Sequence, residues 1–155
     1  MIIYQKYIPK KFKFKKIQKQ LYRLNGFYFS RYVFMQSPFI FCKLIKSKRI
    51  LPQHFESFRR VVRRNIKKTA QLSFYSICDL PVTSKKGGVR MGKGKSNVED
   101  WVFSSKKGCI FSSISNINYK SSFFSYKKAV KKLPVKAKIV RNKFFRYRNY
   151  LNCIE

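Results

Sequence analysis

Residues 85–95 combine glycine and cationic side chains at a spacing that suits anion binding. The stretch holds five cations and four glycines. Glycine has no side chain and tolerates positive φ angles, so backbone amides there can approach phosphate oxygens closely. The interleaved cations place positive charge at the same points. The pattern therefore predicts a loop that binds the phosphates of a nucleotide or of a nucleic acid.

Two nucleotide-binding patterns come close to fitting this loop, and both fail. The triphosphate pattern needs Gly-x-x-x-x-Gly-Lys followed by Ser or Thr, but Gly87, Gly92 and Lys93 are followed by another glycine. The next frame ends in Gly-Lys-Ser at residues 94–96 and has a valine where the first glycine belongs. The dinucleotide pattern Gly-x-Gly-x-x-Gly ends on Asn97 in place of glycine. We therefore expect a flexible basic loop that lies among RNA phosphates, and not an ATPase.

Other side chains that could do chemistry are scattered along the chain. The cysteines are each more than 30 residues from the next, whereas a zinc site or a redox motif needs a close pair. They are Cys42, Cys78, Cys109 and Cys153. The single histidine, His54, has no acid or cysteine arranged around it as a catalytic partner. We therefore expect buried or half-buried free thiols, no metal, no cofactor and no catalytic residue, so that the chain is not an enzyme.

The charge balance indicates a polyanionic partner. Lys and Arg number 37 against five Asp and Glu, which gives a formal net charge of +32. Self-repulsion at this density opposes folding of the isolated chain, and a polyanion would relieve it while counterions are released. The cations run from Lys6 to Arg148, so we expect the partner to surround the chain. Nucleic acid is the first candidate, an anionic membrane the second and an acidic protein the third.

The clearest element in the sequence is a helix over residues 52–68. Its proline suits the first helical position, and four apolar side chains recur at helical spacing on one face. These are Phe55, Phe58, Val62 and Ile66. The opposite face has no acid after Glu56, which suits a helix that packs on a sheet and faces phosphates. Its predicted RNA-binding residues are Arg59, Arg60, Arg63, Arg64 and Lys67. The alternative is a merely solvated basic face.

The remaining pattern predicts strands and a second helix. Aromatic residues favour strands in residues 21–45, where Pro38 implies a turn or an edge. Further strands are expected over residues 72–78 and 135–140, and a hairpin of residues 101–105 and 109–114 turns at 106–108. The second helix is expected over residues 119–133, with an apolar face of Phe123, Tyr126, Val130 and Leu133.

These elements predict an α+β fold in which an antiparallel β-sheet is layered with two α-helices. We expect three parts along the chain. Residues 1–20 form a basic N-terminal arm, residues 21–140 form one RNA-binding α+β domain, and residues 141–155 form a basic C-terminal extension. The domain contains the basic glycine-rich loop over residues 79–97, where one proline and four of the six glycines stand.

The loop and its flanks resemble the family of large-subunit ribosomal protein 16. Residues 90–95 read Arg-Met-Gly-Lys-Gly-Lys, and the family has Arg-Met-Gly-Lys-Gly-Lys-Gly followed by an acid, an aromatic residue and Trp-Val. The match covers roughly residues 49–140. Further matching positions are Glu56, Arg59, Arg60, Asp79, Pro81, Thr83, Lys85, Asn97, Val98, Glu99, Trp101, Val102, Gly108, Lys132, Leu133, Pro134 and Lys136, and more weakly Pro9, Lys10 and Lys11.

The resemblance implies a specific role. Members of this family bind large-subunit rRNA and help shape the aminoacyl-tRNA site, with this loop pointing toward the peptidyl transferase centre, and they are not enzymes. The RNA-binding residues implied in the loop are Lys85, Lys86, Arg90, Met91, Gly92, Lys93, Gly94 and Lys95. The implied partners are large-subunit rRNA, aminoacyl-site tRNA at residues 85–96, and neighbouring ribosomal proteins, with no self-association.

The chain departs from the family at several positions. Ser96 replaces the last glycine of the motif, Asp100 replaces the aromatic residue before the tryptophan, and Lys86 replaces a proline. An aromatic segment over residues 27–41 replaces the glycine-rich stretch before the helix. These departures suggest a divergent, organellar member.

The compartment is inferred from residue usage. Residues with AT-rich codons, such as Lys, Phe, Ile and Asn, are favoured, which suggests an organellar gene. We expect a mitochondrial ribosome, with a plastid-type organelle as the alternative. Residues 1–16 do not look like a cleavable targeting signal. The longest uncharged apolar stretch has eleven residues, at 32–42, whereas a membrane span needs about 20.

Two non-ribosomal alternatives remain from composition alone. One is a basic nucleic-acid-binding protein outside the ribosome. The other is a polybasic protein on a membrane surface, anchored by its aromatic segment. Cations spread over the whole chain speak against the membrane, because membrane binding concentrates them beside one apolar face.

Overall fold

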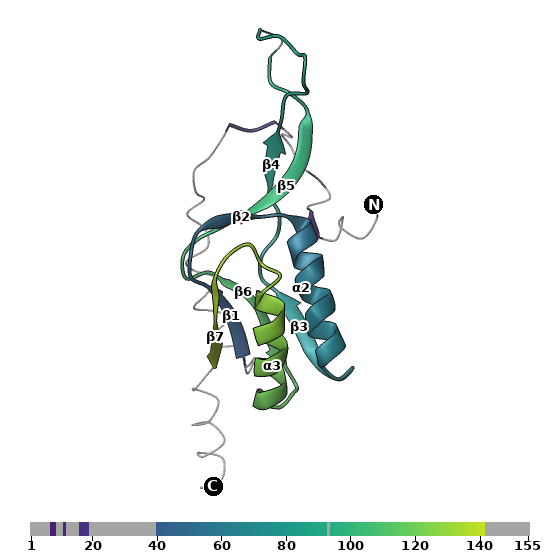
Figure 1. Ribbon diagram of the computed structural model, residues 1–155, viewed down its shortest axis with the longest axis vertical. Coiled ribbons are helices and arrows are strands. Elements are labelled where there is room, and N and C mark those ends of the chain that lie inside the picture. Colours follow the sequence, from purple (N-terminus) through teal and green to yellow (C-terminus); the bar gives the residue numbers. More distant parts are fainter. Residues whose placement is uncertain (1–6, 9–10, 12–15, 19–39, 93, 142–155) are drawn as a thin grey trace, which may run out of the picture.

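The structure is a computed structural model that describes residues 7–8, 11, 16–18, 40–92 and 94–141 (Figure 1). Within them lie seven strands in two antiparallel sheets and two helices. The predicted α+β class is therefore confirmed, although the expected single sheet is divided in two. The strands expected before residue 40, most of the N-terminal arm and the extension after Arg141 lie outside the described residues.

The larger sheet has four strands in the order β3-β6-β1-β7. They are β1 (Ile40–Leu44), β3 (Gln71–Phe74), β6 (Ile110–Ser115) and β7 (Ala137–Arg141). The smaller sheet has the order β2-β5-β4. Its strands are β2 (Lys48–Ile50), β4 (Leu80–Thr83) and β5 (Val98–Ser105). In Figure 1 the strands β4 and β5 extend from the main body toward one end of the long axis.

Helices α2 (Pro52–Asn65) and α3 (Tyr119–Val130) lie side by side against the larger sheet (Figure 1). Phe55 and Phe58 of α2 are fully buried and contact Phe111 of β6 with ring centroids 4.7 and 5.2 Å apart. Tyr126 of α3 reaches the same cluster, 5.8 Å from Phe58. A buried phenylalanine of this kind contributes roughly 1.5–3 kcal/mol. The aromatic cluster therefore joins both helices to the sheet.

The helix α2 begins as predicted and ends earlier than residue 68. Pro52 occupies the first turn, and the Leu51 N–H donates to Nδ1 of His54 at 3.2 Å. Burial lowers the pKa of His54, which keeps this nitrogen neutral and able to accept. The helix stops after Asn65 because Ile66 adopts extended φ and ψ angles and the chain turns into β3. The second helix likewise ends at Val130, before the predicted limit of 133.

One predicted strand pairing and the extent of one predicted loop were wrong, although the strands of the pair exist as β5 and β6. Residues 101–105 and 109–114 were expected to pair as a hairpin, but β5 pairs with β2 and β4 whereas β6 pairs with β1 and β3. The turn at residues 106–108 does exist, and Gly108 has a φ of 88° there. Its N–H donates to the Leu44 carbonyl of β1 at 2.8 Å, so the turn moves the chain from one sheet to the other.

The second error concerns the expected loop over residues 79–97, whose first part is the strand β4. Pro81 suggested a loop, but β4 is an edge strand, where a proline does not remove a needed hydrogen bond. The strands β3 and β7 are present with shifted limits, since β3 ends at Phe74 and β7 begins at Ala137. The irregular segment that remains of the loop is residues 84–97.

The apolar face of α3 also differs from the prediction. Phe123 was expected inside but is 40% exposed, whereas Ser122, Ser125, Tyr126 and Ala129 are buried. The Tyr126 hydroxyl lies 3.2 Å from the Ser112 hydroxyl of β6. Small serines let α3 approach its neighbours closely and leave room for the large tyrosine. The side chains that α3 buries are therefore decided by their size and packing, and not by the spacing of apolar residues alone.

Tyr7, from the N-terminal arm, belongs to the core. Tyr7 is 5% exposed and packs against Phe55, with ring centroids 5.2 Å apart. Its carbonyl accepts from the Cys78 N–H at 2.9 Å, and its hydroxyl donates to Glu56 Oε2 at 3.3 Å. Burial and the nearby Glu56 raise the pKa of Tyr7 to about 12, so the phenol remains a donor.

Glu56 is a buried carboxylate within the helix α2, on the face that sequence reasoning assigned to solvent. It accepts from Arg59 at 2.8 and 2.9 Å and from Arg60 at 3.0 Å. The hydrogen bond from Arg59 is the main cause that lowers the pKa of Glu56 to about 2, against the effect of burial. Glu56 therefore stays charged and couples Tyr7 to two arginines.

We expect Glu56→Gln to remove an acid-sensitive part of the stability. Because the pKa of Glu56 in the folded state lies below its ordinary value of 4.5, the carboxylate stabilises the fold above about pH 4.5, and this contribution is lost as the pH falls toward 2. The carboxylate contributes about 3 kcal/mol to the free energy of unfolding at neutral pH. Urea unfolding of the full chain between pH 7 and pH 3 should show Glu56→Gln less stable at pH 7, with a smaller loss on acidification.

Asp100→Asn is the matched control, because it removes one negative charge from an exposed position of β5. It should leave the acid profile close to that of the native chain. Identical pH profiles for Glu56→Gln and the native chain would show that the carboxylate does not stabilise the fold in this way.

Candidate nucleic-acid interface

The cationic face of α2 begins with two arginines that share one buried acid. Arg59 forms a two-point contact with Glu56, through Nε to Oε2 and Nη2 to Oε1. Arg60 donates from Nε to Oε1 of the same carboxylate. The side chains of Arg59 and Arg60 are still 37% and 52% exposed. Since a guanidinium has five N–H donors, both groups keep donors for an external anion while Glu56 restricts their orientation.

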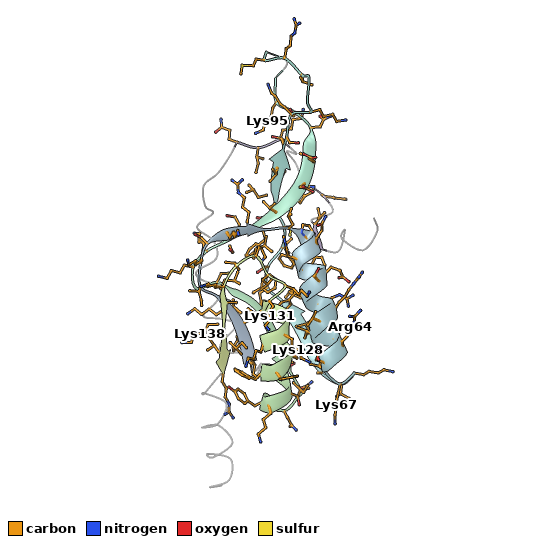
Figure 2. The ribbon with its side chains drawn as sticks, in the orientation of Figure 1. Arg64, Lys67, Lys95, Lys128, Lys131 and Lys138 are labelled. Atoms are coloured by element: carbon orange, nitrogen blue, oxygen red, sulfur yellow. The ribbon has the colours of Figure 1, made fainter. Side chains whose placement is uncertain are left out.

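The same face continues toward the end of the helix. Arg63 is exposed and donates from Nη1 to the Ala70 carbonyl at 3.0 Å, which holds it beside the turn after α2. Arg64 and Lys67 are also exposed. Figure 2 shows Arg64 and Lys67 along the outer side of α2 and at the turn that follows it. The five predicted residues of this face therefore form one stripe of positive charge, and Arg59 is its least exposed member.

Sequence reasoning missed a second group of cations on α3. Lys128 donates from Nζ to the side-chain oxygen of Asn65 at 3.4 Å, which joins the ends of the two helices. Figure 2 shows Lys128 on the helix next to α2 and Lys131 at the C-terminal end of that helix. The exposed lysines of this segment are Lys120, Lys127, Lys128, Lys131 and Lys132. These lysines could have been predicted from the sequence, because α3 contains no acid, just as α2 contains none after Glu56.

The neck of the glycine-rich loop is held from several sides. Thr83 of β4 pairs with Val98 of β5, and the Ser84 hydroxyl donates to Glu99 just beyond that pair. Residues of the N-terminal arm lie on the same neck. Lys16 Nζ donates to the Lys95 carbonyl at 2.9 Å, and Lys95 Nζ donates to the Ile17 carbonyl. The loop therefore starts from a fixed base, and Lys95 contributes to that base.

The loop tip extends away from the rest of the chain. Gly88, Gly92 and Gly94 have φ angles of 82°, 95° and 73°, which L side chains rarely adopt. Met91 is 94% exposed, and residues 84–92 are exposed throughout. Lys93 lies outside the described residues. In Figure 1 the tip stands at the end of the long axis opposite β7. Lys85, Lys86 and Arg90 can therefore be reached by a partner from several sides.

The structure does not bring the two predicted clusters together. The loop projects beyond β4 and β5, whereas the stripe on α2 lies along the main body, and Figure 2 shows Lys95 well separated from Arg64 and Lys67. A single small anion could not contact both. An extended polyanion can follow the chain from one cluster to the other, because its phosphates recur along its length.

Chemistry other than anion binding finds little support in the described residues. Cys42, Cys78 and Cys109 are free thiols, as predicted. Burial raises the pKa of both Cys42 and Cys78 to about 12, which disfavours the reactive thiolate. Within the described ranges no three His, Cys, Asp or Glu side chains group together to hold a metal ion. No helix in this part of the chain is long and apolar enough to cross a membrane.

Comparisons with known proteins identify the family. The family model of ribosomal protein L16p/L10e matches residues 9–140. The large ribosomal subunit protein uL16 of Buchnera aphidicola subsp. Cinara cedri is 36% identical over 132 residues, covering 83% of this chain and 91% of that protein. The uL16 of Acinetobacter baylyi is also 36% identical over 132 residues, covering 85% and 94%. With its projecting Arg-Met-Gly-Lys-Gly-Lys loop, the chain belongs to the ribosomal protein L16 family.

Proposed function

We propose that this chain is a structural constituent of the large ribosomal subunit that binds large-subunit rRNA, with no catalytic residue of its own. The observation that carries the proposal is the glycine-rich loop 84–97, fixed at its neck and exposed at its tip, in a member of this family. Its relatives carry the name of a large ribosomal subunit protein. A net charge of +32 supports a partner that surrounds the chain with phosphates.

The proposed rRNA contacts lie in two regions. One is the α2 stripe of Arg59, Arg60, Arg63, Arg64 and Lys67. The other is the loop, with Lys85, Lys86, Arg90, Met91, Gly92, Lys93, Gly94 and Lys95. Arginine donors can bind phosphate oxygens in pairs, and exposed glycine amides allow close approach of the RNA backbone. The lysines of α3 extend the first region.

The loop tip is proposed to reach the aminoacyl-tRNA site near the peptidyl transferase centre. Its projection beyond the two sheets supports contact with a partner that the main body does not touch. Neighbouring ribosomal proteins are further proposed partners, and self-association is not part of the proposal. The arm 1–20, the domain 21–140 and the extension 141–155 are proposed as three RNA-contacting parts.

The proposed location is the mitochondrial ribosome, with a plastid-type organelle as the second candidate. The residue usage typical of AT-rich genes supports an organelle. The relatives named above are bacterial, so the compartment is tested by finding the genome that carries the gene. The alternative function, a basic nucleic-acid-binding protein outside the ribosome, is tested by co-sedimentation. The proposal requires the chain to travel with large subunits and to leave them only at high salt.

Changing Arg90 and Lys93 to alanine together should impair late subunit assembly or translation, because two cations of the glycine-rich loop are lost. The control changes Lys143 and Arg146 to alanine, which removes the same charge from the C-terminal extension. Polysome profiles and the rate of peptide synthesis should show the larger defect for the loop variant. Equal defects would contradict a special role for the loop.

Changing Arg63 and Arg64 to glutamine should lower the affinity for rRNA mainly through charge. If both cations neutralise phosphates, the slope of log K against log salt concentration becomes shallower by about 2. A filter-binding titration of the full chain at several salt concentrations measures this slope. Lys46→Gln with Lys48→Gln, two exposed cations that precede α2 in the chain and do not belong to its stripe, is the control for net charge. A slope that changes equally in both variants would speak against a defined α2 contact.

A further inference from the structure

The outer side of α3 carries aromatic rings that the core does not use. Tyr119, Phe123 and Phe124 are 37%, 40% and 56% exposed, although the same helix buries Tyr126 completely. The rings of Tyr119 and Phe123 lie with centroids 5.9 Å apart and an interplanar angle of 27°. Tyr119, Phe123 and Phe124 stand on the first two turns of one helix, and these three exposed rings are here called the α3 aromatic patch. Exposed patches of this kind mark contact sites more often than isolated rings do.

Cations are interleaved with these rings. Lys128 Nζ lies 4.4 Å from the centroid of Phe124, and the guanidinium of Arg141, the last residue of β7, lies 4.7 Å from the centroid of Tyr119. Lys120 and Lys127 are exposed on the same helix. Neither α3 nor β7 contains an acid. The aromatic patch therefore sits in a field of positive charge that its own elements do not neutralise.

The chemistry of the patch selects among possible occupants. An apolar protein surface would cover the rings but would take hydration from the surrounding cations without giving charge in return. Duplex RNA would satisfy the cations, but its bases are stacked inside the helix and cannot reach the rings. An unpaired nucleotide offers a flat base for the rings and a phosphate for the cations.

We propose that the α3 aromatic patch binds unpaired nucleotides of RNA by base stacking. This inference rests on the proposed rRNA binding of the chain and adds a second mode of contact to it. Tyr119, Phe123 and Phe124 supply the stacking surface, and Lys127, Lys128 and Arg141 bind the flanking phosphates. The N-terminal end of α3 and the C-terminal end of β7 lie at the opposite end of the long axis from the glycine-rich loop (Figure 1). The two RNA contacts therefore serve different segments of the nucleic acid.

The test compares two forms of RNA on the full chain. The probes are a single-stranded oligouridylate of about 10 nucleotides, which is within the usual site size for stacking proteins, and a duplex RNA of equal length. The first variant carries Phe123→Leu and Phe124→Leu, which keeps an apolar surface without aromatic rings. The second carries Phe123→Trp and Phe124→Trp, which keeps the stacking. Both positions are exposed, so the fold should persist, and thermal unfolding checks this.

The leucine variant should bind the single strand about tenfold more weakly or worse, and the duplex within about twofold of the native chain. Its salt slope should not change, because no cation is removed. The tryptophan variant should bind the single strand at least as tightly as the native chain.

Three results would overturn the inference. One is native single-strand affinity in the leucine variant, and another is an equal loss for single strand and duplex. The third is that the leucine variant enters large subunits normally whereas a variant with alanine at positions 123 and 124 does not, since that result identifies an apolar protein partner. If the native chain still binds duplex RNA and Arg63→Gln with Arg64→Gln weakens it, the proposed function stands while the patch fails. A native chain that binds neither RNA would contradict both.

Discussion

Thirty-seven cations on a chain with five acids set the constraint that every other feature must meet. Any compact state brings like charges together, and repulsion grows as the chain folds. The described residues meet this constraint by separating two kinds of side chain. Phenylalanine and tyrosine concentrate between the helices and the larger sheet, while lysine and arginine stay at the surface. Aromatic burial thus supplies cohesion that charge pairing cannot supply.

Glu56 is an exception to this separation, because it is a charged side chain in the interior. Its carboxylate is buried beside the aromatic cluster and accepts from Arg59, Arg60 and Tyr7. Breaking a buried ion pair of this kind leaves an uncompensated buried charge, so removing either partner strongly destabilises the fold. The same acid therefore serves the interior, where it holds Tyr7, and the exterior, where it orients two guanidiniums. Core and proposed RNA contact are linked through one side chain.

Much of the fold could be predicted from local pattern. Phe55, Phe58 and Val62 recur at helical spacing, and α2 buries all three. The strands with which β5 and β6 pair could not be predicted in this way. Alternation of apolar and polar residues identifies a strand but not its neighbour in the sheet. The turn at Gly108 was visible, yet its hydrogen bond goes to Leu44, more than 60 residues earlier in the chain. Phe123 also followed the apolar pattern but remained outside, since the interior of α3 is selected by fit to Ser112 and Phe58.

Some of the proposed RNA contacts could likewise be predicted from the sequence, and others could not. A run of arginines on α2 and the glycine-rich motif could be found from residue types, and the family resemblance was confirmed by a match over residues 9–140. The double role of Glu56 could not be found, because spacing alone places it on the wet face with its arginines. The neighbouring lysines of α3 needed the packing of α3 against α2 to join that surface.

Tyr7 has a consequence for the order in which the chain is made. Synthesis runs from the N-terminus, so Tyr7 leaves the ribosome that translates it long before its partners Phe55, Glu56 and Cys78 exist. The contact of Lys16 with Lys95 closes later still. Until residue 78 has emerged, the core lacks one of its rings and the arm has no place to bind. These two contacts are therefore tied to translation of the first 95 residues, and until then Tyr7 and Lys16 lack the partners that they have in the fold.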